Sequence, residues 1–253
     1  MRIARLAGPA GPRPAVQDGD HWAVVEDAYA SPPVPTGKRV AASDAVLLAP
    51  VEPRIVLGMA HNSGPADRVL PPQAFMKSAR TVVGPGDPIH LDPRRGHVKG
   101  EAELVLVVGR VCRDISVADA PAYVLGWTVG NDVTAVDQVA LDAMMVQSKS
   151  GDGFTPLGPW IETDLDPLAA GLEAGVAGGE GLSASSADLA WNPYEVLAHL
   201  SAHLTLGPGD VILTGAPGTA FDLEPGSVAR CAVVGIGELV NPAVRFGSVG
   251  TDA

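Results

Sequence analysis

The sequence predicts a strand-rich fold with few helices, and three observations favour it. Gly (30) and Pro (23) are plentiful among the 253 residues while aromatic residues make up 4%, a composition typical of short strands joined by many turns. Short apolar runs recur, for example over 55–58, 104–108 and 211–213. Helical patterns occur near 117–124 and 192–204, so we expect strands to form most of the structure.

The first 50 residues predict a small N-terminal β unit. Residues 23–25 form an apolar run after the turn residues 18–20, and a second apolar run over 45–50 ends the segment. We therefore expect a small β domain over 1–50, followed by a larger domain over 51–250.

One helix of the larger domain has well-defined ends. Asn192 is a capping residue that precedes Pro193 at the first helical position, and the Gly-Pro-Gly-Asp turn over 207–210 cannot continue a helix. The segment 164–190 before it is rich in Ala, Gly and Ser and has no clear period. This composition predicts loops and weak strands.

Charge and cysteine content exclude several classes of partner. The 17 basic residues against 29 acidic ones give a net charge of −12, which repels nucleic acid. The N-terminus lacks the apolar core of a signal peptide, and no stretch reaches the ~18 apolar residues of a membrane span. Two cysteines, Cys112 and Cys231, are too few for a disulfide framework, which fits a reducing compartment. We expect a cytoplasmic protein that binds neither membranes nor nucleic acid.

A pair of glutamates at the head of an apolar strand carries the clearest chemical signal. Glu101 and Glu103 alternate with Ala102, so in an extended strand they project from the same face. Asp132, one strand later, supplies a third carboxylate. Three oxygen ligands leave positions of an octahedral ion for water and substrate, which favours Mg²⁺ or Mn²⁺, whereas zinc prefers nitrogen or sulfur ligands. In the alternative interpretation the glutamates lie on a solvated strand end, paired with Lys99 or Arg110.

Four blocks in this order resemble the signature of the fumarylacetoacetate hydrolase family. They are GEAELVLVVGR (100–110), YVLGWTVGND (123–132), KSGDGFTPLGPW (149–160) and LGPGDVILTGAP (206–217). The match also takes in 75–77 and 235–241 and covers about residues 53–247. The third block is most similar to the isomerase/decarboxylase branch of homoprotocatechuate degradation.

The resemblance implies a fold and a set of functional residues. The fold would be of α+β type, a mixed β-roll with surrounding helices, and the protein would form a homodimer. Glu101, Glu103 and Asp132 would bind Mg²⁺ or Mn²⁺, and Lys149 would be the active-site lysine. Residues expected to contact the substrate are Lys77, Gln138, Thr214 and Gly215.

The chemistry expected from these residues is the stabilisation of an enolate. A 2-oxo acid can chelate the metal through its carboxylate and its 2-oxygen, and the cation and Lys149 then stabilise the negative charge that develops there. We expect isomerisation or tautomerisation of a 2-oxo or 2-hydroxydienoic diacid. The alternatives are C–C hydrolysis or decarboxylation, and a non-catalytic binding protein.

The chain departs from the family where members carry a water-handling His–Glu pair. Gly64 occupies the histidine position and Asp67 the glutamate position, while His61 falls where a tyrosine is usual. Hydrolysis is therefore less favoured than isomerisation. His61 or His97 could transfer the proton instead, because an imidazole titrates near neutral pH.

Two further patterns have simpler explanations. Glu195, His199 and His203 follow at four-residue spacing on the predicted helix, but Leu200 stands where helical zinc proteases carry a catalytic glutamate, so we expect a solvated or packed face. Lys149 and Ser150 are adjacent, and in an extended segment their side chains would point apart, which disfavours a Ser/Lys nucleophile.

Overall fold

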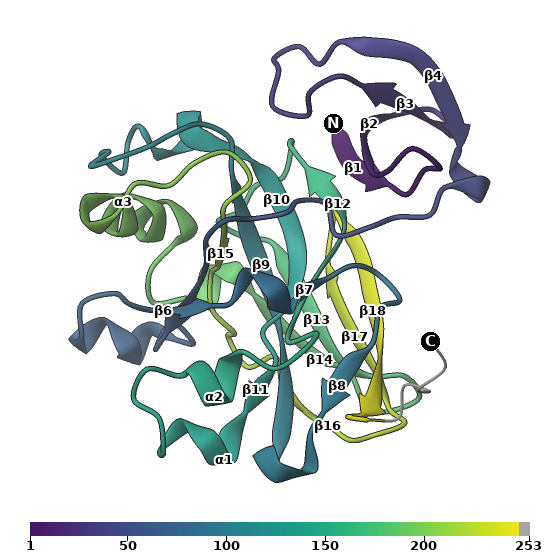
Figure 1. Cartoon of the computed structure of the whole chain (residues 1–253). Coiled ribbons are helices and arrows are strands. Elements are labelled where there is room, and N and C mark those ends of the chain that lie inside the picture. The colour runs from purple at the N-terminus through teal and green to yellow at the C-terminus, as the bar shows by residue number, and fades with distance from the viewer. Residues whose placement is uncertain (248–253) are drawn as a thin grey trace.

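Two β-sheets form most of the protein (Figure 1). The computed structural model describes residues 1–247. The strands of the first half are β1 (Arg2–Leu6), β2 (Arg13–Asp18), β3 (His21–Val25), β4 (Pro35–Ala41), β5 (Val56–Ala60), β6 (Gln73–Lys77), β7 (Val82–Val83), β8 (Ile89–Leu91) and β9 (Val98–Val108). Those of the second half are β10 (Val124–Asn131), β11 (Thr134–Ala135), β12 (Thr155–Glu162), β13 (Gly171–Val176), β14 (Leu182–Ser185), β15 (Val211–Leu213), β16 (Ala220–Leu223), β17 (Val228–Val233) and β18 (Gly237–Arg245).

The larger sheet has the order β4-β3-β2-β1-β12-β10-β9-β15-β5-β6, with β7, β11 and β16 attached to its members. The second sheet has the order β14-β13-β17-β18-β8 and packs against β9, β10 and β12 of the first. Parallel pairs, such as β15 with β5, occur beside antiparallel ones, such as β9 with β10. This mixed arrangement confirms the α+β fold and the β-roll expected from the resemblance.

Strand β9 lies at the centre of the fold and is buried on both faces. Leu104 and Leu106 belong to the core between the two sheets, whereas Val105 and Val107 pack into a second cluster on the opposite face. Alternation of side chains along a strand explains why a continuous apolar run is needed here. Glu101 and Glu103 share the face of Val105, so the sheet fixes the direction in which both carboxylates point.

The N-terminal strands β1 to β4 form an antiparallel meander that joins the larger sheet at one edge. Arg2 and Ile3 of β1 pair with Glu162 and Ile161 of β12, and Figure 1 shows the purple meander at the margin of the molecule. The apolar run over 45–50 is not a strand: its contact with the sheet is a bridge between Leu47 and Leu6. A division at residue 50 stays a prediction, and 248–250 lie outside the described residues.

Helices are short and few among the described residues. Helix α3 (Pro193–His203) confirms the predicted 192–204 helix, and Asn192 caps it by accepting from the N–H groups of Tyr194 and Glu195. The predicted helix near 117–124 is instead a 3₁₀ turn, Ala120–Tyr123. It ends at Tyr123, whose carbonyl accepts from Gly109 N–H where β10 begins to pair with β9. The segment 164–190 contains β13 and β14, in line with the expected weak strands.

Two further helices lie beside β9, β11 and β6. Helices α1 (Val136–Val139) and α2 (Val146–Lys149) are single turns, and Figure 1 shows both next to β11. The 3₁₀ turns besides Ala120–Tyr123 are Ala42–Asp44, Pro65–Val69, Ala79–Thr81, Pro93–Arg95 and Ser186–Asp188. Within residues 1–247 we find no helix that has both the length and the apolar character needed to cross a membrane.

Candidate functional site

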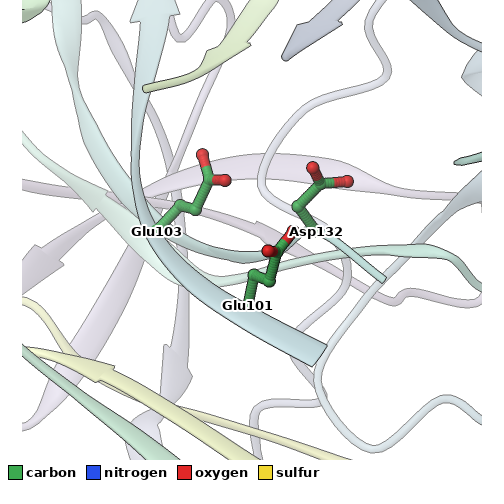
Figure 2. Close-up of side chains that lie close together, drawn as sticks. All are labelled: Glu101, Glu103 and Asp132. Carbon is green, nitrogen blue, oxygen red and sulfur yellow. The ribbon is translucent and has the colours of Figure 1, made fainter. Parts of the chain in front are cut away.

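Three carboxylates converge where β9 passes the end of β10. Glu101 and Glu103 project from β9, and β10 pairs with it so that Asn131 lies opposite Ala102. Asp132 follows directly, and its N–H donates to the carbonyl of Glu101 at 2.9 Å. One oxygen from each of the three acids lies within 4.8 Å of the others. Figure 2 shows the two glutamates on one ribbon and Asp132 on the adjacent segment.

Two lysines hold the aspartate of this triad. Lys149, the last residue of α2, donates to Asp132 Oδ2 at 2.5 Å and to Thr134 Oγ1 at 2.7 Å, and it reaches Glu101 Oε2 at 3.4 Å. Lys77, the last residue of β6, donates to Asp132 Oδ1 and to the carbonyl of Phe154. Both carboxylate oxygens of Asp132 therefore have a cationic partner.

Asp132 and the two glutamates of the site differ in how the protein compensates their negative charge. Burial alone would raise the pKa of Asp132, but Lys149 and Lys77 more than offset this and hold the pKa below its usual range. Burial raises the pKa of Glu103 well above its ordinary value, and the negative charges of Asp132 and Glu101 raise it further. Burial also raises the pKa of Glu101, although the positive charge of Lys149 opposes the shift. The two glutamates therefore carry negative charge that the protein compensates incompletely.

This donor set fits a divalent cation bound by oxygen. Three carboxylates face two lysines here, and Glu103, 2% exposed, accepts a hydrogen bond at Oε2 from Gly215 N–H at 2.6 Å. A buried carboxylate is costly unless a cation pairs with it. Glu101, Glu103 and Asp132 would supply the hard oxygen ligands that Mg²⁺ and Mn²⁺ prefer.

The triad and Lys149 lie on the wall of a cavity of about 240 Å³. The other residues that line it are Met59, Ala60, His61, Ser63, Phe75, Thr134, Val139, Met145 and Ala216. Lys149 Nζ lies 4.5 Å from the centre of the Phe75 ring, a cation–π contact that adds to its anchoring. The ring fits there because its partner across the β5–β6 pair is Gly58, where a Cβ would lie 2.4 Å from the ring.

Two cavity residues have a left-handed backbone that is unusual for their side chains. His61 has φ 54° and Met145 has φ 57°, whereas such conformations cost free energy in residues other than glycine. Met145 directly precedes α2, and its carbonyl accepts from Lys149 N–H at 2.9 Å. This turn sets the position from which Lys149 reaches the triad.

The residues expected to contact substrate lie at different depths. Gln138 donates to the carbonyl of Arg95, and Thr214 Oγ1 donates to the carbonyl of Leu104. Gly215 reaches the site through its N–H bond to Glu103, and the side chain of Lys77 is fully buried against Asp132. None of these four residues is on the cavity wall within the described part of the chain.

The two histidines proposed for proton transfer are separated by the fold. His61 lines the cavity. His97 lies outside it, and its Nε2 is 2.8 Å from Asp222 Oδ1. At the positions where the resemblance places a His–Glu pair, Gly64 has no side chain and Asp67 accepts from the N–H of Ser63.

The alternative interpretations of the sequence can be compared with these contacts. Lys99, the suggested partner of the glutamates, lies 3.9 Å from Asp222 instead. Glu195 binds Arg68 and closes the capping box with Asn192, which removes it from a site with His199. Lys149 lies in a helical turn and not in an extended segment, which corrects our description of that stretch, and Ser150 Oγ accepts from Ser78 N–H.

Sequence reasoning missed several contributors to the site. Thr134 connects Lys149 to Glu101, because its hydroxyl accepts from the lysine and donates to the glutamate at 3.2 Å. Its position two residues after Asp132 was a signal that could have been used. Val139 and Met145 gave no chemical signal, since apolar residues are found in every core.

The fold agrees with what comparison with known proteins shows. The model of the fumarylacetoacetate (FAA) hydrolase C-terminal domain matches residues 48–244, and the Rv2993c-like N-terminal model matches residues 1–50. The chain therefore belongs to the fumarylacetoacetate hydrolase family. Protein Rv2993c of Mycobacterium tuberculosis is 35% identical over 268 residues, covering 98% of this chain and 99% of the relative.

Two solved structures are similar over nearly the whole length. The 5-carboxymethyl-2-hydroxymuconate delta-isomerase of Mycobacterium smegmatis has a TM-score of 0.91 at 37% identity, covering 97% of this chain and 100% of that one. The 2-hydroxyhepta-2,4-diene-1,7-dioate isomerase of Mycobacterium marinum has a TM-score of 0.92 at 36% identity, covering 98% and 99%.

Other matches carry further activities in their names. The mitochondrial oxaloacetate tautomerase fahd2 of Xenopus laevis is 34% identical over 221 residues, covering 80% of this chain and 69% of that protein. The 4-hydroxyphenylacetate degradation bifunctional isomerase/decarboxylase of Salmonella dublin is 36% identical over 177 residues, covering 68% and 40%. A maleylpyruvate hydrolase of Sphingobium, solved with manganese(II) and pyruvate, has a TM-score of 0.80 at 25% identity, covering 97% and 100%.

Proposed function

We propose that the protein is a divalent-metal-dependent enzyme that isomerises or tautomerises a 2-oxo or 2-hydroxydienoic acid through an enolate. The observation that carries this proposal is the set of three carboxylates and Lys149 on one cavity wall. The names of the relatives support it, since two similar structures are isomerases and a curated relative is a tautomerase. The manganese in the maleylpyruvate hydrolase structure supports Mg²⁺ or Mn²⁺ as the cofactor.

A metal ion held by the triad would supply the positive charge that binds a 2-oxo acid and stabilises its enolate. The residues of the chain prepare the site for this charge. Asp132 and Thr134 orient the ammonium of Lys149, whose pKa burial would lower but which Asp132 and Glu101 raise above its ordinary value. Lys149 therefore stays protonated and can stabilise a developing oxyanion beside it. The ring of Phe75 packs against this ammonium and limits its hydration.

His61 is the cavity residue best suited to carry a proton between carbon positions. It lines the cavity near its exposed side, and a neutral imidazole can accept a proton and return it. Gly64 and Asp67 do not provide a base aimed at water, since one lacks a side chain and the other accepts from Ser63 N–H. These positions favour isomerisation over hydrolysis.

Decarboxylation is the second candidate, and a bifunctional isomerase/decarboxylase among the relatives supports it. An enolate centre can serve either reaction, because both place negative charge on the same oxygen. The test is a set of assays with and without EDTA: enol–keto conversion of 2-hydroxymuconate-type diacids, oxaloacetate decarboxylation and acylpyruvate cleavage. We expect enol–keto conversion that depends on the metal. Lack of any metal-dependent turnover would favour a non-catalytic binding protein.

We also propose that the protein works as a homodimer. Large apolar side chains are exposed near the cavity, among them Val69 (86%), Leu141 (73%) and Met144 (77%), and exposed apolar groups of this size are typical of contact surfaces. Light scattering coupled to size-exclusion chromatography would give twice the chain mass of 25.8 kDa. A mass equal to one chain would contradict the dimer.

A further inference from the structure

Apart from the triad, Lys149 and Thr134, most of the cavity wall is apolar. Met59, Phe75 and Ala216 are buried residues of this wall, and Val139 and Met145 complete its apolar part with Ala60. The remaining polar groups are the hydroxyl of Ser63 and the ring of His61. A substrate bound with its 2-oxo acid end at the carboxylates would place the rest of its chain among these methyl, thioether and aromatic groups.

Within residues 1–247, Lys149 is the sole lysine or arginine on the cavity wall. It is already paired with Asp132. Two arginines on neighbouring segments bind elsewhere: Arg68 pairs with Glu195 and lies over the Trp191 ring, and Arg95 donates to the carbonyl of Gln147. A second carboxylate on the substrate would therefore lose water without gaining a lysine or arginine partner.

We propose that the site selects a 2-oxo monocarboxylic acid with a short apolar tail over the corresponding diacid. The inference rests on the proposed function, because it takes the carboxylate triad as the place where the 2-oxo acid end binds. A carboxylate moved from water into apolar surroundings pays a large desolvation cost unless it is paired. An alkyl group of similar size gains by leaving water. Both effects favour the monocarboxylic acid over the diacid.

Binding of two unreactive analogues tests this selectivity without turnover. N-Oxalylglycine carries a second carboxylate, and N-propyloxamate carries an alkyl group in its place, while both keep the oxalyl end that chelates a metal. In isothermal titration with the Mg²⁺-loaded protein, we expect N-propyloxamate to bind on the order of 10-fold or more tightly. Equal binding, tighter binding of N-oxalylglycine, or binding of neither would overturn the inference.

A matched pair of variants tests whether the cavity wall sets the preference between the two analogues. Val139→Arg places a guanidinium at the cavity wall, on a side chain that is 38% exposed, and Leu141→Arg places one two residues away at a position that is 73% exposed and outside the wall. We expect the first variant to gain affinity for N-oxalylglycine by about 10-fold relative to N-propyloxamate. We expect the second to keep the parent ratio. The same change in both variants would mean that general charge, and not the wall, sets the preference.

Turnover separates failure of this inference from failure of the proposed function. Exchange of the C3 protons in D₂O, followed by ¹H NMR with Mg²⁺ and against an EDTA control, compares 2-oxohexanoate with 2-oxoglutarate. Faster exchange of 2-oxohexanoate supports the inference. Exchange of 2-oxoglutarate at an equal or greater rate overturns the inference and leaves the proposed function standing. Metal-dependent exchange of neither acid overturns both.

Discussion

The ammonium of Lys149 lies 2.5 Å from one oxygen of Asp132 and thereby ties helix α2 to the turn after β10. The second oxygen of the same carboxylate accepts from Lys77 at the end of β6. Three segments that are distant in the sequence thus meet on one aspartate. Because Asp132 is satisfied by these lysines, the charge that a cation must balance lies mainly on Glu101 and Glu103.

Glu103→Gln is expected to stabilise the metal-free protein at neutral pH. The folded-state pKa of Glu103 is raised by burial, so protonation of this group stabilises the fold below the ordinary glutamate pKa, and that stability is lost as pH rises through the folded-state pKa. A neutral amide avoids this loss. We expect a gain of roughly 1 kcal/mol, or about 2–4 °C in the unfolding midpoint, with EDTA at pH 7.5. The gain should vanish near pH 4.

Metal addition should reverse the order of the unfolding midpoints of the parent and Glu103→Gln. Mg²⁺ or Mn²⁺ binds the folded state of the parent and raises its midpoint, whereas Glu103→Gln lacks a ligand and should respond weakly. Glu238→Gln, which alters an exposed carboxylate paired with Arg230, is the control and should respond like the parent. Equal stabilisation of all three proteins by metal would place the metal site elsewhere.

Lys77→Met is expected to destabilise the protein strongly. The side chain of Lys77 is fully buried, and its removal leaves Asp132 without one of two cationic partners in a dry environment. Loss of one member of a buried ion pair costs roughly 3–5 kcal/mol. Arg230→Met removes an exposed partner of Glu238 and should leave the midpoint nearly unchanged. Similar urea midpoints for the two variants would show that the buried pair contributes little.

Much of the site could be predicted from the sequence because its residues occupy regular positions on strands. Alternation on β9 placed Glu101 and Glu103 on one face, and the short connection after β10 brought Asp132 beside them. The apolar part of the cavity could not be predicted in this way. Val139 and Met145 reach the wall through two single-turn helices whose position depends on long-range contacts of Lys149, and a short helix has little stability of its own.

The same distinction between local and long-range signals explains the errors in the predicted secondary structure. Helix α3 has a capping residue, a proline and a following turn, all local signals that act on neighbouring backbone groups. The expected helix near 117–124 had no local signal strong enough to compete with β-pairing. The carbonyl of Tyr123 therefore accepts a hydrogen bond from Gly109 N–H at the edge of the sheet. Tertiary hydrogen bonds therefore decide the structure where local signals are weak.

His61→Asn should alter the pH dependence of turnover, whereas His97→Asn should not. His61 lines the cavity and His97 lies outside it beside Asp222. If the imidazole of His61 transfers the proton, kcat in the first variant should fall by about 10²–10⁴-fold and the pH profile should change shape. The His97 variant serves as the control and should keep the parent profile. An unchanged profile in both variants would exclude both of these histidines as the proton carrier.

Gly215→Ala should weaken metal binding through the backbone. Gly215 has φ +115°, and a Cβ there would lie 2.2 Å from the carbonyl oxygen of Asn62, so the turn must move and the N–H bond to Glu103 must lengthen. Gly218→Ala is the control, because Gly218 has φ +81° but no atom within 4 Å of the added Cβ. Both variants carry the cost of a positive φ, about 1 kcal/mol, and only the first disturbs Glu103. We therefore expect a larger Kd for Mn²⁺ in Gly215→Ala, measured by titration calorimetry, and an equal loss of affinity in both variants would contradict this role of the Gly215 N–H.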